Sequence, residues 1–434
     1  MEEDGENRCI LRKGPLVSTA AHTPTTVAVV GAGMVGLATA WFLQERGVEV
    51  TVLDREGVGA GASWGNAGWL TPGIATPLPE PAVLKYGLKA VFSPNSPVYV
   101  PPLASRTLIR FVTGFTAHST MKAWRRAMAS LVPINDLSLD GFDRLTDGGV
   151  DAPTLQARSF TAAYRTKEES HTLLEEFRHI KSCGGQISWD VLDGDQARAV
   201  EPALSEEIAA ALVLHDQRYI NPGVFVDALA ASVVARGGKI VAGAHVADVK
   251  DAGAGVVVTL ADGTTSSYDQ AVVATGAWFR HLVTQLGVTR VVQAGRGYSF
   301  SVNVDSMPTG PVYFPSARIA CTPLGDRLRV AGMMEFRRPS APLDPRRIQA
   351  IVEAARPLLR GADLDHRQDE WVGSRPCTID GLPLIGATRS PRVFVAGGHG
   401  MWGITLGPVT GRLLAEQMTT GRVPLELRPF NPLR

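Results

Sequence analysis

Cysteine is scarce in this sequence, and neither charge is in excess. The four cysteines, Cys9, Cys183, Cys321 and Cys377, show no CxxC or metal-ligand spacing. They indicate reduced thiols in a cytoplasmic protein rather than a disulfide framework. The 43 Lys and Arg residues nearly balance the 42 Asp and Glu residues, so the charge does not favour nucleic acid as a partner.

Metal-binding patterns and long apolar runs are also missing. The nine histidines form no HxxxH or HExxH pattern, and we therefore predict no metal site. No apolar run approaches the length of a membrane-spanning helix. Residues 1–24 lack the apolar core of a signal peptide, and we interpret them as a disordered extension. The length of 434 residues, with 45 glycines, fits an α/β protein of two or three domains.

The segment from Val27 to Asp54 has the pattern of a dinucleotide-binding unit. An apolar strand over 27–30 leads into the sequence GAGMVG at 31–36. A helix to about residue 44 and a second strand over 48–53 follow. This strand–turn–helix–strand order favours nucleotide binding over an ordinary glycine-rich turn, but it does not separate FAD from NAD.

Each glycine of this motif has a separate physical role. Gly31 permits the tight turn, Gly33 lets the backbone approach a pyrophosphate, and Gly36 lets the helix pack closely on the strand. The helix N-terminus offers unpaired N–H groups to the phosphates. Asp54 stands at the spacing expected of an acid that accepts hydrogen bonds from ribose hydroxyls.

The segment 55–73 is too rich in glycine for a packed helix or a central strand. Small residues there would let the backbone run along a flat ligand, and Ser63 and Asn66 offer hydrogen bonds. The alternative is a flexible surface loop. The adjacent nucleotide-binding pattern favours ligand contact.

Downstream, the pattern alternates between helices and short strands. We predict helices over 103–139, 166–183, 222–236 and 345–359, strands over 239–249 and 256–260, and an antiparallel sheet over 291–335. A strand running into Ala274-Thr275-Gly276 forms a second candidate cofactor segment. A third is formed by GSRPCTIDGLPLIG at 373–386 with VFVAGGHGMWGIT at 393–405, where a strand and a glycine-rich turn precede a helix over 405–418.

These three motifs resemble the D-amino acid oxidase superfamily of flavoproteins, and NAGWLTPG at 66–73 is similar to its bacterial D-amino acid dehydrogenase branch. The resemblance runs from about Thr26 to the C-terminus. It implies a Rossmann-type α/β domain for FAD over 25–75, 215–285 and 370–434. It also implies an α+β substrate domain with an antiparallel sheet over 76–214 and 286–369.

The motifs and the resemblance together place FAD contacts along the whole chain. The expected positions are Gly31, Gly33, Met34, Val35, Gly36, Asp54, Arg55, Ser63, Asn66, Ala67, Gly68, Val246, Ala274, Thr275, Gly276, Gly398, His399, Gly400, Met401, Trp402, Gly403, Ile404 and Thr405. Some relatives attach FAD through a cysteine near Cys377. The spacing differs here, so we expect a non-covalent flavin.

Arg375 occupies the position of the superfamily's carboxylate-binding arginine. A guanidinium beside a flavin binds a carboxylate through two parallel hydrogen bonds and thereby orients the substrate's Cα. The alternative is a structural arginine paired with Asp369 or Asp380.

Other candidates for the catalytic site are Tyr298, Tyr313, Arg318 and His399. The two tyrosines would form the pocket wall or donate to the substrate carboxylate, and the alternative for each is a core tyrosine. Arg318 is a candidate second carboxylate contact. We interpret His399 as a flavin neighbour, with a role as general base as the less favoured alternative.

The resemblance implies an FAD-dependent enzyme that oxidises the Cα–N bond of an amino acid or secondary amine to an imine. D-amino acids are favoured as substrates, and a quinone is favoured over oxygen as electron acceptor. The alternatives are a flavin-carrying subunit of a larger amine-oxidising assembly and an NAD-linked dehydrogenase.

The predicted helix over 103–139 is basic and amphipathic, with five cationic side chains: Arg106, Arg110, Lys122, Arg125 and Arg126. A solvated outer face explains this pattern most simply. The alternative is peripheral contact with the inner, anionic face of a membrane.

Overall fold

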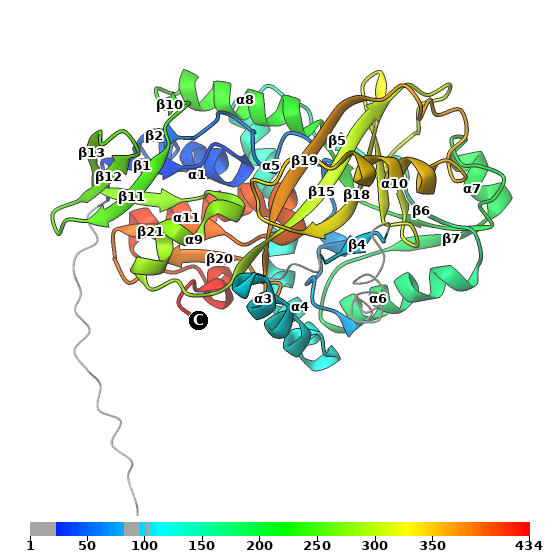
Figure 1. The fold of residues 1–434 in the computed structure, drawn as a ribbon, viewed down its shortest axis with the longest axis horizontal. Coiled ribbons are helices and arrows are strands. Elements are labelled where there is room, and N and C mark those ends of the chain that lie inside the picture. The colour runs from blue at the N-terminus through cyan, green and yellow to red at the C-terminus, as the bar shows by residue number, and fades with distance from the viewer. Residues whose placement is uncertain (1–22, 82–95, 101–104) are drawn as a thin grey trace, which may run out of the picture.

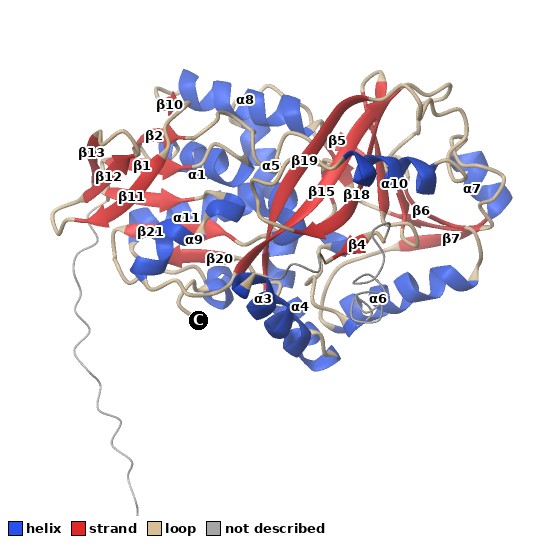
Figure 2. Ribbon diagram, in the orientation of Figure 1, coloured by secondary structure: helices blue, strands red, loops and turns tan. Residues whose placement is uncertain are grey.

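The computed structural model describes residues 23–81, 96–100 and 105–434. The predicted extension at 1–24 therefore lies outside the described residues except for its last two positions. The described chain is built on two large sheets, with helices packed against them (Figures 1 and 2). In the described ranges, no helix is both long enough and apolar enough to span a membrane.

The first large sheet has six strands and lies on the left in Figure 1. In spatial order its strands are β10 (Lys239–Val241), β2 (Glu49–Leu53), β1 (Thr26–Val30), β14 (Gln270–Val273), β21 (Val393–Gly397) and β20 (Leu384–Ala387). All neighbours pair in parallel except β20, which is antiparallel to β21. Burial of both faces explains why β1 and β14 are almost wholly apolar.

Three helices pack against this sheet or against one another beside it. They are α1 (Met34–Gln44), α8 (Pro222–Ala235) and α11 (Gly403–Thr420). Glycine allows α11 to approach α1 closely, because a Cβ at Gly411 would lie only 2.6 Å from the Thr39 nitrogen. The shared core includes Leu37, Trp41 and Leu414, which are fully buried.

A small antiparallel sheet stands at the left edge of Figure 1, formed by β11 (Val246–Asp251), β12 (Val256–Leu260) and β13 (Thr265–Tyr268). The sequence predicted one strand over 239–249. Instead, a turn separates β10 from β11, and Gly243 takes φ +74° there. A left-handed glycine is incompatible with a continuous strand, so the single-strand prediction was wrong.

The second large sheet has nine strands and lies on the right in Figure 1. Its main path runs through β19 (Gln368–Thr378), β15 (Val292–Val302), β18 (Arg327–Phe336), β17 (Ile319–Leu324), β16 (Val312–Phe314), β6 (Phe160–Tyr164), β8 (Ala210–Leu214) and β7 (Trp189–Asp193). The short β4 (Val98–Tyr99) pairs with β18. Most pairs are antiparallel, as the alternating sequence over 291–335 predicted.

The helix α10 (Pro345–Ala355) packs on this sheet through Ile348 and Ile351, which share a buried cluster with Tyr298 and Phe300 of β15. Two other helices, α6 (His171–Ser182) and α7 (Gly194–Val200), accompany the strands β6 to β8. A third, three-stranded sheet joins β3 (Trp69–Leu70), β9 (Arg218–Tyr219) and β5 (Leu155–Gln156).

Where it is described, the predicted helix over 103–139 consists of α3 (Arg106–His118), α4 (Met121–Asp136) and the first two residues of α5 (Ser138–Asp147). The chain breaks at Ser119, and the Thr120 hydroxyl accepts a hydrogen bond from the Ala123 N–H to cap α4. The prediction of one continuous helix did not take this cap into account.

The predicted division into domains stays a prediction, but one boundary has a structural detail. The expected boundary at residue 370 falls inside β19, which pairs with β15 of the nine-stranded sheet from Gln368 to Thr378. The chain then returns to the six-stranded sheet at β20. The strand β19 therefore carries the GSRP motif of 373–376 along the boundary between the two sheets.

Candidate active site

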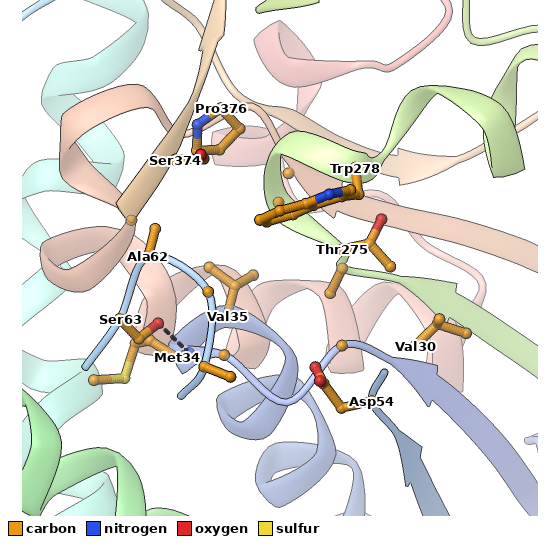
Figure 3. A pocket seen from close by; sticks show the side chains of 18 of the residues that line it. Val30, Met34, Val35, Asp54, Ala62, Ser63, Thr275, Trp278, Ser374 and Pro376 are labelled. Carbon is orange, nitrogen blue, oxygen red and sulfur yellow. Dashed lines mark hydrogen bonds between the residues drawn. The ribbon is translucent and has the colours of Figure 1, made fainter. Parts of the chain in front are cut away.

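A cavity lies at the carboxyl ends of β1, β2, β14 and β21 (Figure 3). Parallel strands of an open α/β sheet place ligands at this end. Most predicted cofactor contacts line this first cavity: Gly31, Gly33, Met34, Val35, Asp54, Arg55, Ser63, Asn66, Val246, Ala274, Thr275, Gly276, His399, Gly400, Met401, Gly403 and Ile404. Segments more than 300 residues apart in the sequence thus form one wall.

The turn after β1 has the geometry that its glycines predict. Gly31 takes φ +116°, and a Cβ there would lie 2.5 Å from the Ala274 carbonyl oxygen. A Cβ at Gly36 would overlap the Gly31 carbonyl oxygen. The glycine-rich loop is joined to this turn because the Met34 N–H donates to the Ser63 hydroxyl at 3.1 Å (Figure 3).

Asp54 lines the cavity and also organises its rim. One carboxylate oxygen accepts a hydrogen bond from the Ala32 N–H at 2.8 Å. The other accepts from the N–H groups of Glu56 and Gly57 at 2.8 and 2.9 Å. A carboxylate has about four lone-pair sites, so these bonds leave capacity for a ribose hydroxyl.

Two observations show that the first cavity fits a dinucleotide such as FAD. The buried Thr275 hydroxyl has no hydrogen-bond partner within the described chain, although it lines the cavity. Gly276 and Gly400 take φ +54° and +56°, and a Cβ at either would meet no atom within 4 Å. Backbone of this kind forms open cradles for flat or anionic groups.

Six predicted cofactor contacts do not line the first cavity. Gly36 and Gly68 serve close packing, since a Cβ at Gly68 would overlap the Ile220 carbonyl oxygen. A Cβ at Gly398 would lie 2.8 Å from the Thr378 side chain, and the Thr405 hydroxyl donates to the Trp69 carbonyl at 2.9 Å. Ala67 and Trp402 line a second cavity instead.

The first cavity also has lining residues that the sequence analysis did not predict. Trp278 lies across the cavity from Asp54 in Figure 3, and the Arg55 guanidinium stands 4.7 Å from its ring centre. Ser374 and Pro376 complete the wall from β19. Trp278 follows directly after the Ala-Thr-Gly motif, and this position was the available signal.

The second cavity adjoins the first, because Asn66, Arg375 and Met401 line both. Its volume is about 290 Å³, near the lower end of the range for small-molecule sites. Strands β16, β17 and β18, the helix α6 and the segment 66–80 supply most of its remaining wall. Its position beside the cofactor cavity makes it the candidate substrate site.

Arg375 stands at the junction without a carboxylate partner among the described residues. One guanidinium nitrogen donates to the Met333 carbonyl at 3.0 Å. Burial lowers the pKa of Arg375, which shows that its charge is poorly solvated there. The predicted alternative was wrong, because Asp369 pairs with Arg327 at 2.9 Å and Asp380 with Arg434 at 3.1 Å.

Tyr298 lines neither cavity described here and fits the alternative of a core tyrosine. Its hydroxyl donates to the buried Glu335 carboxylate at 2.6 Å, beneath α10. Strand alternation explains this position. A Cβ at the neighbouring Gly297 would overlap the Arg375 guanidinium, so residue 298 faces the opposite side of the sheet.

Tyr313 and Arg318 both line the second cavity, and their contacts with a substrate carboxylate stay predictions. Burial raises the pKa of the Tyr313 hydroxyl, and the hydroxyl is hydrogen-bonded to Arg318. Arg318 also lies 4.0 Å from Glu80. It has φ +55°, a backbone conformation that costs energy in a non-glycine residue and is frequent at functional sites.

His399 lies in the wall of the first cavity, where it was predicted, and is almost fully buried. Its Nε2 is 3.0 Å from the Thr410 hydroxyl oxygen. Burial lowers the pKa of His399 to about 4, so the imidazole is neutral near pH 7. An imidazole with so low a pKa is a weak proton acceptor, which favours a cofactor neighbour over a general base.

Comparison with known proteins agrees with this geometry. Residues 26–417 match the family model described as FAD dependent oxidoreductase, DAO. A D-amino acid dehydrogenase of Methylobacterium radiotolerans is 30% identical over 408 residues, which cover 92% of this chain and 96% of that protein.

Solved structures share the fold. Glycine oxidase from Geobacillus kaustophilus superposes with a TM-score of 0.70 at 23% identity, covering 95% of this chain and 99% of that one. The FAD-bound L-alpha-glycerophosphate oxidase from Mycoplasma pneumoniae also gives 0.70, at 17% identity, over 91% and 94% of the two chains. The chain is an FAD-dependent enzyme and belongs to the DAO family of oxidoreductases.

Proposed function

We propose that this enzyme oxidises the Cα–N bond of an amino acid, with D-amino acids preferred, or of a secondary amine, to an imine. The observation that carries the proposal is Arg375, a half-buried cation without a carboxylate partner in the described chain, at the junction of the two cavities. Identity of 30% to a D-amino acid dehydrogenase supports the D preference.

Arg375 would bind the substrate carboxylate through a bidentate hydrogen-bonded ion pair and so hold Cα at the mouth of the first cavity. Tyr313 and Arg318 line the same cavity and would bound the substrate on the side of β16 and β17. When bound, FAD supplies the two-electron oxidation: the Cα–H bond breaks with transfer of hydride, and the nitrogen lone pair forms the C=N bond.

The amine must be neutral for this step, because its lone pair forms the new double bond. His399 does not serve as the base in this account, since it is bonded to Thr410 and its pKa is lowered to about 4 by burial. Water then converts the released imine to a 2-oxo acid and ammonia, or a cyclic imine persists.

The proposed flavin is non-covalent. Cys377 is 1% exposed, lies beside Gly295 and Met334, and is not part of the first cavity's wall. Burial raises the pKa of the Cys377 thiol to about 12, so it carries almost no nucleophilic thiolate near pH 7.

For the electron acceptor we infer a quinone rather than oxygen, which the name of the dehydrogenase relative supports. Contact with an anionic membrane surface would bring the enzyme close to a quinone in the membrane. Between Arg106 and Asn135 the helices α3 and α4 contain no acidic residue, and Ile109 and Val112 are 54% and 39% exposed. Cosedimentation with anionic but not neutral vesicles would test this contact.

The visible spectrum of the purified, FAD-saturated protein tests the function. We expect a flavin band that bleaches when D-amino acids, but not L-amino acids, are added without oxygen. If neither D- nor L-amino acids bleach the band, the assignment of amino acids as substrates is wrong and secondary amines are favoured. If the isolated protein shows no turnover with any amine, the alternative of a flavin-carrying subunit gains support.

A further inference from the structure

The second cavity has an acidic wall formed by Glu80, Glu169 and Glu176. The cations lining this cavity are Arg318 and Arg375. Arg318 lies 4.0 Å from Glu80. Glu169 accepts hydrogen bonds from the Ser316 hydroxyl at 3.0 Å and from the Arg165 N–H at 3.3 Å. Once Arg375 holds a substrate carboxylate, the wall retains more negative than positive charge.

Of the three carboxylates, only Glu80 forms an ion pair within the described ranges, and Glu176 has fewer hydrogen bonds than Glu169. The hydrogen bond to Glu176 comes from the Thr76 hydroxyl at 3.1 Å. Burial, followed by the negative charge of Glu80, raises the pKa of Glu176 to about 7. An acid is held in this state when the folded protein supplies too little positive charge for it.

Tyr164 provides a second, independent observation. Its side chain is 2% exposed and lines the second cavity, yet its hydroxyl has no hydrogen-bond partner within the described ranges. An unpaired buried hydroxyl costs stability, and its presence in a cavity wall indicates a ligand that satisfies it.

Glu176 is also connected to the junction of the cavities. The Thr76 carbonyl accepts a hydrogen bond from the Trp402 indole at 2.7 Å, and Trp402 follows Met401, which lines both cavities. Phe177, the next residue along α6, is fully buried and anchors this turn of the helix. A group bound at Glu176 is thus held at a fixed place relative to Arg375.

Resting on the function proposed above, we propose that Glu176 and Tyr164 bind a cationic group on the substrate's side chain. The preferred substrate is then an amino acid that carries an amino or guanidino group beyond Cα. Its carboxylate contacts Arg375, and its methylene groups pack on apolar lining residues such as Trp69 and Leu173.

The charged and titratable groups around Glu176 all enter this assignment. Glu80, Glu169, Arg318, Tyr164 and Tyr313 face the same cavity. Arg318 offsets Glu80 at 4.0 Å. A side-chain cation would lie beside Glu176 and give that carboxylate the ion pair that the protein itself does not provide.

The test compares two D-amino acid substrates of similar length, one with a side-chain amine and one with an uncharged side chain. The Glu176→Gln variant should raise KM for the cationic substrate by about tenfold or more, the loss expected for one hydrogen bond to a charged group. Its kcat for that substrate, and both constants for the uncharged one, should change less than about twofold.

The matched control is Glu175→Gln, an exposed neighbour on the same helix that lines neither cavity. A second variant, Tyr164→Phe, should weaken binding of the cationic substrate but not of the uncharged one, and it should leave the flavin spectrum unchanged. Equal kinetics of wild-type protein and Glu176→Gln for the cationic substrate would overturn the assignment.

The outcome for the wild type separates this proposal from the function on which it rests. Flavin bleaching by uncharged D-amino acids, with cationic ones bound more weakly, would overturn the cation site and leave the oxidation intact. Bleaching by no amino acid at all would overturn both.

Discussion

The two cavities differ in what forms their walls. The first is lined largely by backbone at glycines and small residues, such as Gly33, Gly276 and Gly400. The second is lined by large side chains from β16, β17, β18 and α6, including Tyr313 and Met333. Backbone recognition requires particular residue types at fixed spacings, whereas a side-chain pocket is assembled from segments with no common pattern. Cofactor contacts are therefore easier to predict from sequence than substrate contacts.

We expect the largest effect from a substitution that prevents the first cavity from binding FAD. Gly36→Val would force a side chain into the Gly31 carbonyl oxygen, which is backbone and cannot move aside. We expect protein without a flavin band even at saturating FAD, with a lowered Tm. The control is Gly47→Asn, at an open turn with φ +77° that asparagine accepts. Retention of the flavin band in Gly36→Val would contradict the close approach of helix and turn.

The pH dependence of kcat/KM tests the role of the Glu176 side chain in the second cavity. The raised pKa of Glu176, about 7, means that the group is mostly protonated at pH 6 and ionised at pH 8. For a cationic substrate, kcat/KM relative to an uncharged substrate should therefore rise about tenfold from pH 6 to 8. The Glu176→Gln variant should flatten this ratio. A ratio independent of pH in the wild type would argue against a direct contact.

Thr275→Val should weaken the binding of FAD without changing the shape of the second cavity. The unpaired Thr275 hydroxyl is expected to bond the cofactor, and its loss should raise the Kd for FAD by about fivefold to tenfold. Quenching of flavin fluorescence on addition to the apoprotein measures this Kd. Thr265→Val, on the exposed strand β13, is the control. An unchanged Kd would mean that the hydroxyl does not meet the cofactor.

The smallest effect on catalysis is expected at Tyr298. Tyr298→Phe removes the hydrogen bond to Glu335 and should lower the free energy of unfolding by about 1.5–3 kcal/mol. Its kcat/KM should remain within about twofold of the wild type, because the side chain faces α10 rather than a cavity. Denaturant unfolding and steady-state kinetics measure the two quantities. A large kinetic loss with unchanged stability would favour the pocket-wall role for this residue instead.

The same contrast explains which parts of the site the sequence predicted. Gly31, Asp54 and Thr275 were found because a cofactor turn constrains both residue type and spacing. Arg375 was found through the GSRP motif on β19. For Tyr298 the choice between pocket wall and core stayed open, because the sequence of β15, with glycine at positions 295 and 297, does not fix which residues face which side of the sheet.

Glu176 and Tyr164 were not predicted as site residues. Glu176 is a polar position on an amphipathic helix, and Tyr164 ends a strand in which every residue is buried. Neither local pattern carries a functional signal, since the site exists only when α6 and β6 meet the segment 66–80. The break between α3 and α4 was missed because the cap at Thr120 is set by one side chain.

The most direct test of the account is the flavin spectrum of Arg375→Met beside that of the wild type, without oxygen. Both proteins should bind FAD, because the cofactor contacts are mostly backbone. The wild type should bleach within seconds of adding a D-amino acid, while the variant should bleach at least about 10²-fold more slowly. Arg375→Lys should lie between them, since it keeps the charge but not the bidentate contact. Bleaching of Arg375→Met at the wild-type rate would contradict the claim that this arginine joins the two cavities into one active site.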